Sequence, residues 1–172
     1  MGELRAHGLA VAVPRGWDAR IRSRASEVDQ PPGGLRRATA GERMDLPVLQ
    51  AASFRLPAET GDFGSDAVER MGPEDVLVCV LEFDDADAGS PLYRRSGVPR
   101  LQAASFDPAS MQRTIAGQCG TQAFFTAGGR AFCAYAVLGR ARDIEPLVAK
   151  VNGLLQSVVI AARPVGAPGS AR

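Results

Sequence analysis

Apolar residues recur along the chain in short runs that proline and glycine interrupt, and this pattern predicts strands rather than long helices. The predicted strands are 8–13, 19–24, 47–54, 76–83, 100–106, 122–126, 130–138 and a closing strand at 158–160. The run 76–83 is almost continuously apolar, which is typical of a central strand covered on both faces. Arginine alternates with other residues along 19–24, which predicts a half-exposed edge strand. We expect the strands on either side of Gly128 and Gly129 to form a hairpin.

One amphipathic helix is predicted near the end of the chain. Its apolar positions follow helical spacing: Ile144, Leu147, Val148, Val151, Leu154, Leu155 and Val158. Asp143 is expected to cap this helix, and Pro146 fits its first turn. A short helix over 65–71 with Ser65 as its cap, and a helical turn at Asp107, are also predicted. Because a single apolar stripe must be buried against a sheet, the pattern predicts an α+β fold, a mainly antiparallel β-sheet flanked by helices.

The hydrophobic pattern predicts one domain over 1–162, since no linker divides it. Proline and glycine in 29–47 indicate a flexible loop, and 163–172 is expected to be a disordered tail. The hexapeptide Leu-Gln-Ala-Ala-Ser-Phe occurs at 49–54 and again at 101–106. Two strands with small side chains that let a helix approach closely is the plainer interpretation, and a repeated ligand-facing strand is the alternative.

Composition excludes several classes of protein. Of 172 residues, 45% are hydrophobic and 23% are charged, with a formal net charge of +1, which argues against intrinsic disorder. No apolar run approaches the roughly 20 residues that cross a bilayer, so we expect no membrane partner. The nearly neutral charge removes the bulk electrostatic reason to expect nucleic-acid binding. The first residues carry no apolar signal segment, and together with an odd number of cysteines this predicts the cytoplasm.

The residues that usually carry chemistry are sparse. His7 is the only histidine and is expected to be a solvated side chain. No two of the three cysteines have the spacing of a metal or redox motif. We expect Cys79 and Cys133 to be buried and Cys119, beside two glycines, to be exposed. No metal, no cofactor and no catalytic residue is therefore predicted, and we expect the protein not to be an enzyme.

Charge is unevenly distributed along the chain. Residues 59–87 contain ten carboxylates and one arginine, a net charge of −9. Residues 88–142 contain seven arginines and one aspartate, a net charge of +6. Folding can interleave these stretches and cancel their charge, which is the favoured interpretation. Otherwise the protein has an acidic and a basic face that would steer partners in a salt-dependent way.

A candidate partner-binding surface follows the acidic stretch; its residues are Asp84, Asp85, Asp87, Tyr93, Arg94, Arg95 and Arg100. The aspartates alternate ahead of a glycine, as calcium ligands can, but a solvated turn is favoured because no bidentate glutamate follows. The arginines beside the tyrosine could hold a phosphate or a carboxylate patch through charge-assisted hydrogen bonds. An ordinary solvated loop is the favoured interpretation.

The segment 11–17, a strand that runs into Pro-Arg-Gly-Trp, resembles the PsbP-like α/β/α sandwich superfamily. The closing helix and strand over 147–160 are similar to the ending of such domains, and 129–139 is similar to uncharacterised actinobacterial proteins of this size. The resemblance covers the first and last portions of the chain and hardly extends to 25–75. It implies a non-enzymatic fold that presents a surface to protein partners, and it transfers no catalytic residue.

These observations predict a protein-binding adaptor or regulatory domain whose partner is an unidentified protein, with a second copy of this chain as one candidate. The alternative is a domain that binds a small apolar ligand in a pocket between helix and sheet. Four aromatic residues could fill or line such a pocket: Phe124, Phe125, Phe132 and Tyr135.

Overall fold

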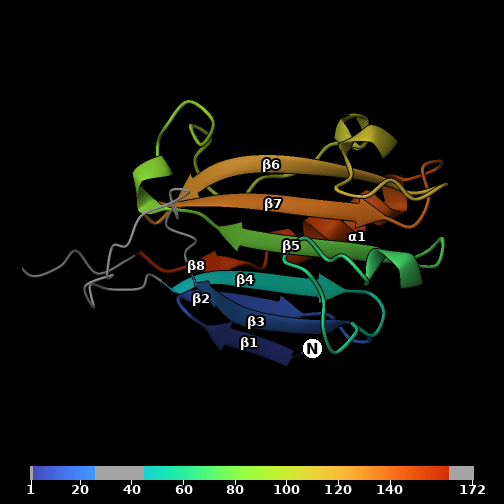
Figure 1. Cartoon of the computed structure of the whole chain (residues 1–172), viewed down its shortest axis with the longest axis horizontal. Coiled ribbons are helices and arrows are strands. Elements are labelled where there is room, and N and C mark those ends of the chain that lie inside the picture. The colour runs from blue at the N-terminus through green and yellow to red at the C-terminus, as the bar shows by residue number, and fades with distance from the viewer. Residues whose placement is uncertain (1, 26–44, 163–172) are drawn as a thin grey trace, which may run out of the picture.

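The computed structural model describes residues 2–25 and 45–162, which form two antiparallel sheets and one α-helix (Figure 1). The five-stranded sheet has the order β3-β4-β5-β7-β6, and the three-stranded sheet has the order β1-β2-β8. The strands of the larger sheet are β3 (Asp18–Ala25), β4 (Asp45–Ala52), β5 (Val76–Glu82), β6 (Cys119–Ala127) and β7 (Arg130–Leu138). The strands of the smaller sheet are β1 (Gly2–Ala6), β2 (Leu9–Val13) and β8 (Val159–Ile160). A mixed fold with mainly antiparallel strands is therefore confirmed.

Three predictions about the larger sheet are confirmed. Every residue of β5 is buried, and β5 pairs with β4 on one side and β7 on the other. β3 is an edge strand. β6 and β7 form a hairpin whose Gly128 and Gly129 have φ angles of 59° and 72°, values that favour glycine in a two-residue turn.

The helix α1 (Glu145–Leu155) lies over one face of the larger sheet, beside the smaller sheet. Leu147, Val151 and Leu154 share a buried cluster there with the alternate β5 residues Val76 and Val78. The predicted cap is wrong: Ile144 occupies the N-cap and makes no side-chain capping bond. Asp143 precedes it with a φ of +48°, a backbone conformation outside the helical region.

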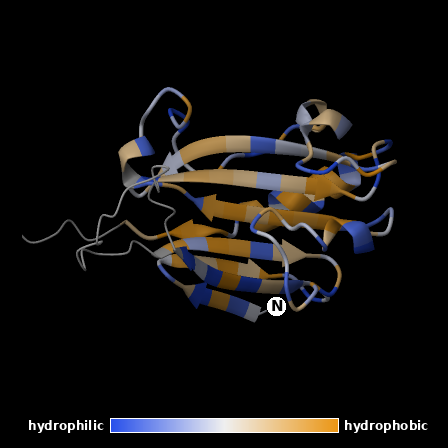
Figure 2. Cartoon of the chain, viewed as in Figure 1, coloured by the Kyte–Doolittle hydropathy of each residue, from blue (hydrophilic) through white to orange (hydrophobic). Residues whose placement is uncertain are grey.

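The opposite face of the larger sheet is covered by the segment 53–75. The β5 residues that point this way, Leu77 and Cys79, are buried with Leu56 and Val68 in a second cluster. Figure 2 shows how strongly apolar β5 is along its length. The helix predicted over 65–71 is only a 3₁₀ turn, η1 (Val68–Arg70), which no side chain caps. So short a segment cannot offset the cost of helix nucleation by its own hydrogen bonds. In the described residues one α-helix therefore lies on the sheet, where flanking helices were predicted.

The two copies of the hexapeptide adopt different conformations. Residues 49–52 belong to β4, which neighbouring strands pair on both sides. Residues 101–106 form no strand, so that prediction is wrong; they contain a 3₁₀ turn, η3 (Ala103–Ser105). The reason is a competing partner, since the Asn152 side chain bonds both the N–H and the carbonyl of Leu101, at 2.8 and 2.9 Å. The turn predicted at Asp107 is confirmed as η4 (Pro108–Ser110), because the Asp107 carboxylate accepts the N–H of Ala109 at 2.6 Å.

β1 was not predicted, because its side chains are mostly exposed and show no apolar alternation. The disordered tail predicted at 163–172, and most of the loop predicted at 29–47, lie outside the described residues.

Candidate functional site

The predicted partner-binding residues lie on a long loop, 84–100, between β5 and β6. The 3₁₀ turn η2 (Asp85–Asp87) lies near the start of the loop, and Asp85 is the first residue of that turn. Asp84 is exposed and its carboxylate accepts the N–H of Ala86 at 2.9 Å, while Asp87 is half-buried. Asp84 therefore stabilises the turn locally. No group of three histidine, cysteine, aspartate or glutamate side chains that could hold a metal ion occurs in 2–25 and 45–162.

Tyr93 is 4% exposed, so its ring is part of the packing beneath the loop and cannot be an outer contact. The ring lies 5.9 Å from the Phe83 ring and 5.5 Å from the Phe124 ring, centroid to centroid. Burial, with a smaller contribution from Asp87, raises the pKa of Tyr93 to about 12. Tyr93 thus anchors the loop on the face of the sheet opposite the helix.

Thr126 on β6 fixes the backbone of the loop by four hydrogen bonds. Its N–H donates to the Arg95 carbonyl at 2.7 Å, and its carbonyl accepts the N–H of Gly97 at 2.8 Å. Its hydroxyl donates to the Tyr93 carbonyl at 2.8 Å and accepts the N–H of Gly89 at 2.9 Å. The loop has few residues in regular secondary structure, yet one strand residue holds it at four points.

The outer surface of the loop combines an apolar side chain with unpaired arginines. Leu92 is 58% exposed. Arg94, Arg95 and Arg100 are exposed, and within the part of the chain that the structure describes their guanidinium groups form no ion pair or hydrogen bond. We call Leu92, Arg94, Arg95 and Arg100 the loop surface. The sequence missed Leu92 as a site residue, because a lone leucine in a loop gives no sign of its exposure.

The acidic and basic stretches are interleaved, as favoured from the sequence. Three ion pairs join them: Glu69 with Arg113, Glu74 with Arg140, and Glu82 with Arg130. The loop surface keeps its charge because its arginines take no part in this pairing.

The ion pair between Arg130 and Glu82 is buried. The Arg130 side chain is 5% exposed and the Glu82 side chain is 0% exposed. Arg130 donates from Nε to Glu82 Oε1 at 2.8 Å and from Nη2 to Oε2 at 2.6 Å. The same guanidinium also donates to the carbonyls of His7 and Ala161, at 3.2 and 3.1 Å. This pair therefore ties the smaller sheet to the end of β5 and β7.

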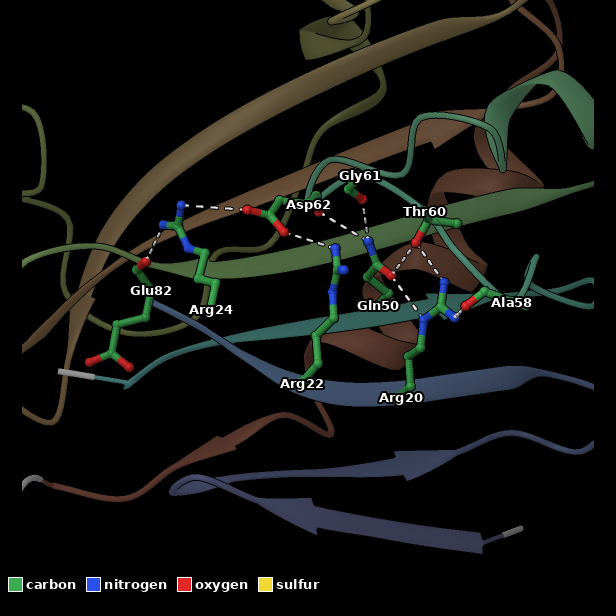
Figure 3. Close-up of polar contacts among 9 residues, drawn as sticks. All are labelled: Arg20, Arg22, Arg24, Gln50, Ala58, Thr60, Gly61, Asp62 and Glu82. Atoms are coloured by element: carbon green, nitrogen blue, oxygen red, sulfur yellow. Dashed lines mark hydrogen bonds and ion pairs between the residues drawn. The ribbon is translucent and has the colours of Figure 1, made fainter. Parts of the chain in front are cut away.

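A row of arginines on β3, the strand predicted as a half-exposed edge, holds the segment that crosses the sheet (Figure 3). Arg20 donates to the side chain of Gln50 at 3.0 Å and to the carbonyls of Pro57 and Ala58, each at 2.9 Å. Arg22 and Arg24 both contact the carboxylate of Asp62. The alternation of arginines every second residue was the available signal, because it places all three on one face of the strand.

Asp62 accepts from Arg22 at 2.8 Å and lies 3.6 Å from a nitrogen of Arg24. An open pocket of about 590 Å³ beside this row is lined by Arg20, Arg22, Ala58, Glu59, Thr60, Gly61 and Asp66. Two arginines and two carboxylates line it, so its charge favours neither an anion nor a cation. The three arginines use their hydrogen bonds and ion pairs on other residues of this chain, which indicates a structural role.

The three thiols are buried, which confirms the prediction for Cys79 and Cys133 and makes the one for Cys119 wrong. Cys119 is 2% exposed because it starts β6, and its Sγ donates to the Arg140 carbonyl at 3.3 Å. Burial raises the pKa of Cys79 and of Cys133 to about 12, and it also raises the pKa of Cys119. Thiols that stay protonated are poor nucleophiles.

Comparisons of this chain with protein-family models, with curated proteins and with solved structures found no match. No helix within 2–25 and 45–162 has the length and apolar composition that crossing a membrane requires.

Proposed function

We propose that this chain is a non-enzymatic protein-binding domain that contacts its partner through the loop surface. The observation that carries the proposal is the exposed Leu92, followed closely in the chain by the exposed, unpaired Arg94 and Arg95, on a backbone that Thr126 holds in place. A single exposed leucine is ordinary. Arginine beside an apolar side chain is typical of interfaces, where it pairs with carboxylates around a dry centre.

The rigidity of the loop favours binding. A loop that must become ordered on association loses conformational entropy, and that loss weakens binding. Here the buried Tyr93 ring and the four bonds of Thr126 already order the loop. The partner that fits is a protein surface with a small apolar recess rimmed by aspartate or glutamate.

The non-enzymatic part of the proposal is supported by the thiols, whose raised pKa values keep them protonated near neutral pH. The three free thiols are also consistent with a reducing compartment, and we keep the cytoplasm as the proposed location. We keep the PsbP-like sandwich as a proposal for the fold family. The one helix on one face of the larger sheet is compatible with it.

The alternative function, an apolar ligand pocket between helix and sheet, is not favoured by the geometry. Phe125 and Phe132 stack at 5.5 Å on the helix side and are fully buried. Tyr135 belongs to the cluster on the opposite face, and Phe124 contacts Tyr93 there. These four aromatic side chains therefore cannot line a single pocket.

The test is capture from a lysate of the source organism, compared between two matched variants. Arg94→Glu with Arg95→Glu reverses two charges on the loop surface. Arg15→Glu with Arg142→Glu reverses two exposed arginines outside it. We expect both variants to fold, the first to lose a salt-sensitive partner that the wild type retains, and the second to keep it. Equal capture by both variants would overturn the proposal.

A further inference from the structure

The outer edge of β6 is closed at two points. Near its start, Gly120 exchanges two backbone hydrogen bonds with Asp107, at 2.9 and 3.1 Å. Near its end, Thr126 bonds the segment around Ser96 in a parallel bridge. Figure 1 shows β6 at the outer edge of the larger sheet, with the loop 84–100 at one end and the turns η3 and η4 at the other.

Between these points the edge is open. Ala127 and Arg130 close the two-residue hairpin as a hydrogen-bonded pair, so Ala127, Phe125 and Ala123 bond to β7. The residues between them direct their N–H and carbonyl groups away from β7. Gly120 and Thr126 have partners on that outer side. The corresponding groups of Gln122 and Phe124 have none among residues 2–25 and 45–162.

We propose that this open stretch of β6 binds an extended acidic segment of the partner as an added strand; this inference rests on the proposed function and names the element the partner uses. Gly120 and Thr126 are six residues apart, about 20 Å along a strand, which leaves room for about four extended residues. Gln122 and Phe124 offer two donors and two acceptors to such a segment.

The positive charge of Arg94 and Arg95 favours an acidic segment. Arg94 and Arg95 lie at the end of the opening where Arg95 accepts from Thr126, and their guanidinium groups are exposed and unpaired in the described residues. A glutamate or aspartate in the added strand can pair with them, whereas a lysine would be repelled. Phe124 is half-buried against Tyr93 and offers an apolar neighbour to the side chain of the segment that lies opposite it on the same face.

The two bridges could instead serve only to shield a sheet edge from pairing. The two interpretations differ in what the amides of Gln122 and Phe124 do when a peptide is offered. The probe is a peptide of about four residues, the length that the opening holds, which alternates glutamate with valine, and its control alternates lysine with valine. The readout is residue-resolved amide hydrogen exchange of the full chain.

We expect the Gln122 and Phe124 amides to exchange fast in the free protein and about tenfold more slowly with the glutamate peptide. The amides of Ala123 and Phe125, already bonded to β7, should not change. The lysine peptide should have no effect. Slow exchange at Gln122 and Phe124 in the free protein, or no slowing with the glutamate peptide, would overturn the inference.

A pair of variants provides an independent readout. Gln122→Pro removes one outward N–H without removing a bond to β7, and Gln122→Ala removes the side chain but keeps the N–H. Binding of the glutamate peptide, followed by fluorescence anisotropy, should weaken at least tenfold for the proline variant and little for the alanine variant. Equal binding by both would overturn the added strand. That failure leaves the loop surface intact, since lysate capture by the arginine variants tests the loop surface separately.

Discussion

The hydroxyl of Thr126, in the edge strand β6, donates to the carbonyl of Tyr93 in the loop 84–100 at a distance of 2.8 Å. The same oxygen accepts the N–H of Gly89 at 2.9 Å, so one side chain joins the loop to the sheet at two points. This contact turns a segment with little regular structure into a fixed surface.

Replacing Thr126 by valine should loosen the loop. Valine has nearly the same shape but removes both hydroxyl bonds, at a cost of about 1–3 kcal/mol in the free energy of unfolding. Chemical denaturation measures that cost, and amide exchange at Gly89 should accelerate. Thr126→Ser keeps the hydroxyl and is the matched control. If valine and serine variants exchange alike at Gly89, the hydroxyl does not hold the loop.

Tyr93 should protect the loop from proteolysis through its buried ring. Tyr93→Ala removes the packing against Phe83 and Phe124, so trypsin should cleave after Arg94 and Arg95 faster than in the wild type. Tyr93→Phe retains the ring and should cleave at the wild-type rate. Peptide mapping by mass spectrometry identifies the sites. Equal cleavage of the alanine variant and the wild type would show that the ring does not anchor the loop.

Breaking the buried ion pair should cost far more than breaking an exposed one. Arg130→Met removes the two hydrogen bonds that the guanidinium donates to the Glu82 carboxylate, which is 0% exposed. The expected loss is about 3–5 kcal/mol in the free energy of unfolding. Arg113→Met removes the exposed pair with Glu69 and should cost less than about 1 kcal/mol. Urea denaturation of both variants compares them, and similar losses would contradict the structural role of Arg130.

Stability should fall as pH rises above about 9. Burial raises the pKa of Cys79 and Cys133 from the usual value of 9.0 to about 12, so the folded state keeps protons that the unfolded state releases. Each thiol should lower the free energy of unfolding by about 1.4 kcal/mol per pH unit within that window, and below pH 9 its contribution is constant. Urea denaturation from pH 8 to 10.5 measures the slope. The double variant Cys79→Ala and Cys133→Ala should show a shallower slope; an unchanged slope would contradict the assignment.

The elements that the sequence predicted correctly are those whose local sequence pattern matches the way the same residues pack in the structure. The two glycines of the β6–β7 hairpin and the continuous apolar run of β5 each determine an element through their own chemistry. The hexapeptide shows the limit of such signals, because four residues of its first copy belong to a strand beside β5, while its second copy forms no strand and contains a 3₁₀ turn beside the residue that Asn152 bonds. Tertiary partners decide that difference, and no local pattern contains them.

The candidate site was predictable only in part. The arginines of the loop surface stood out as a basic cluster, and the structure leaves them exposed. Tyr93 belonged to the same cluster in sequence but is buried, because Phe83 and Phe124 lie on the same face of the sheet. The role of Thr126 depends on bonds that span more than 30 residues, which the sequence alone does not indicate.

The most direct test of the loop surface is site-specific photo-crosslinking in a lysate of the source organism. A photoreactive phenylalanine analogue is placed at Leu92 in one protein and at Val159 in another, because these are the large hydrophobic residues that are exposed in the described part of the chain. The account predicts that the Leu92 position captures a discrete protein, that added salt abolishes its capture, and that the Val159 position does not capture it. The same crosslinks from both positions, or none from Leu92, would contradict it.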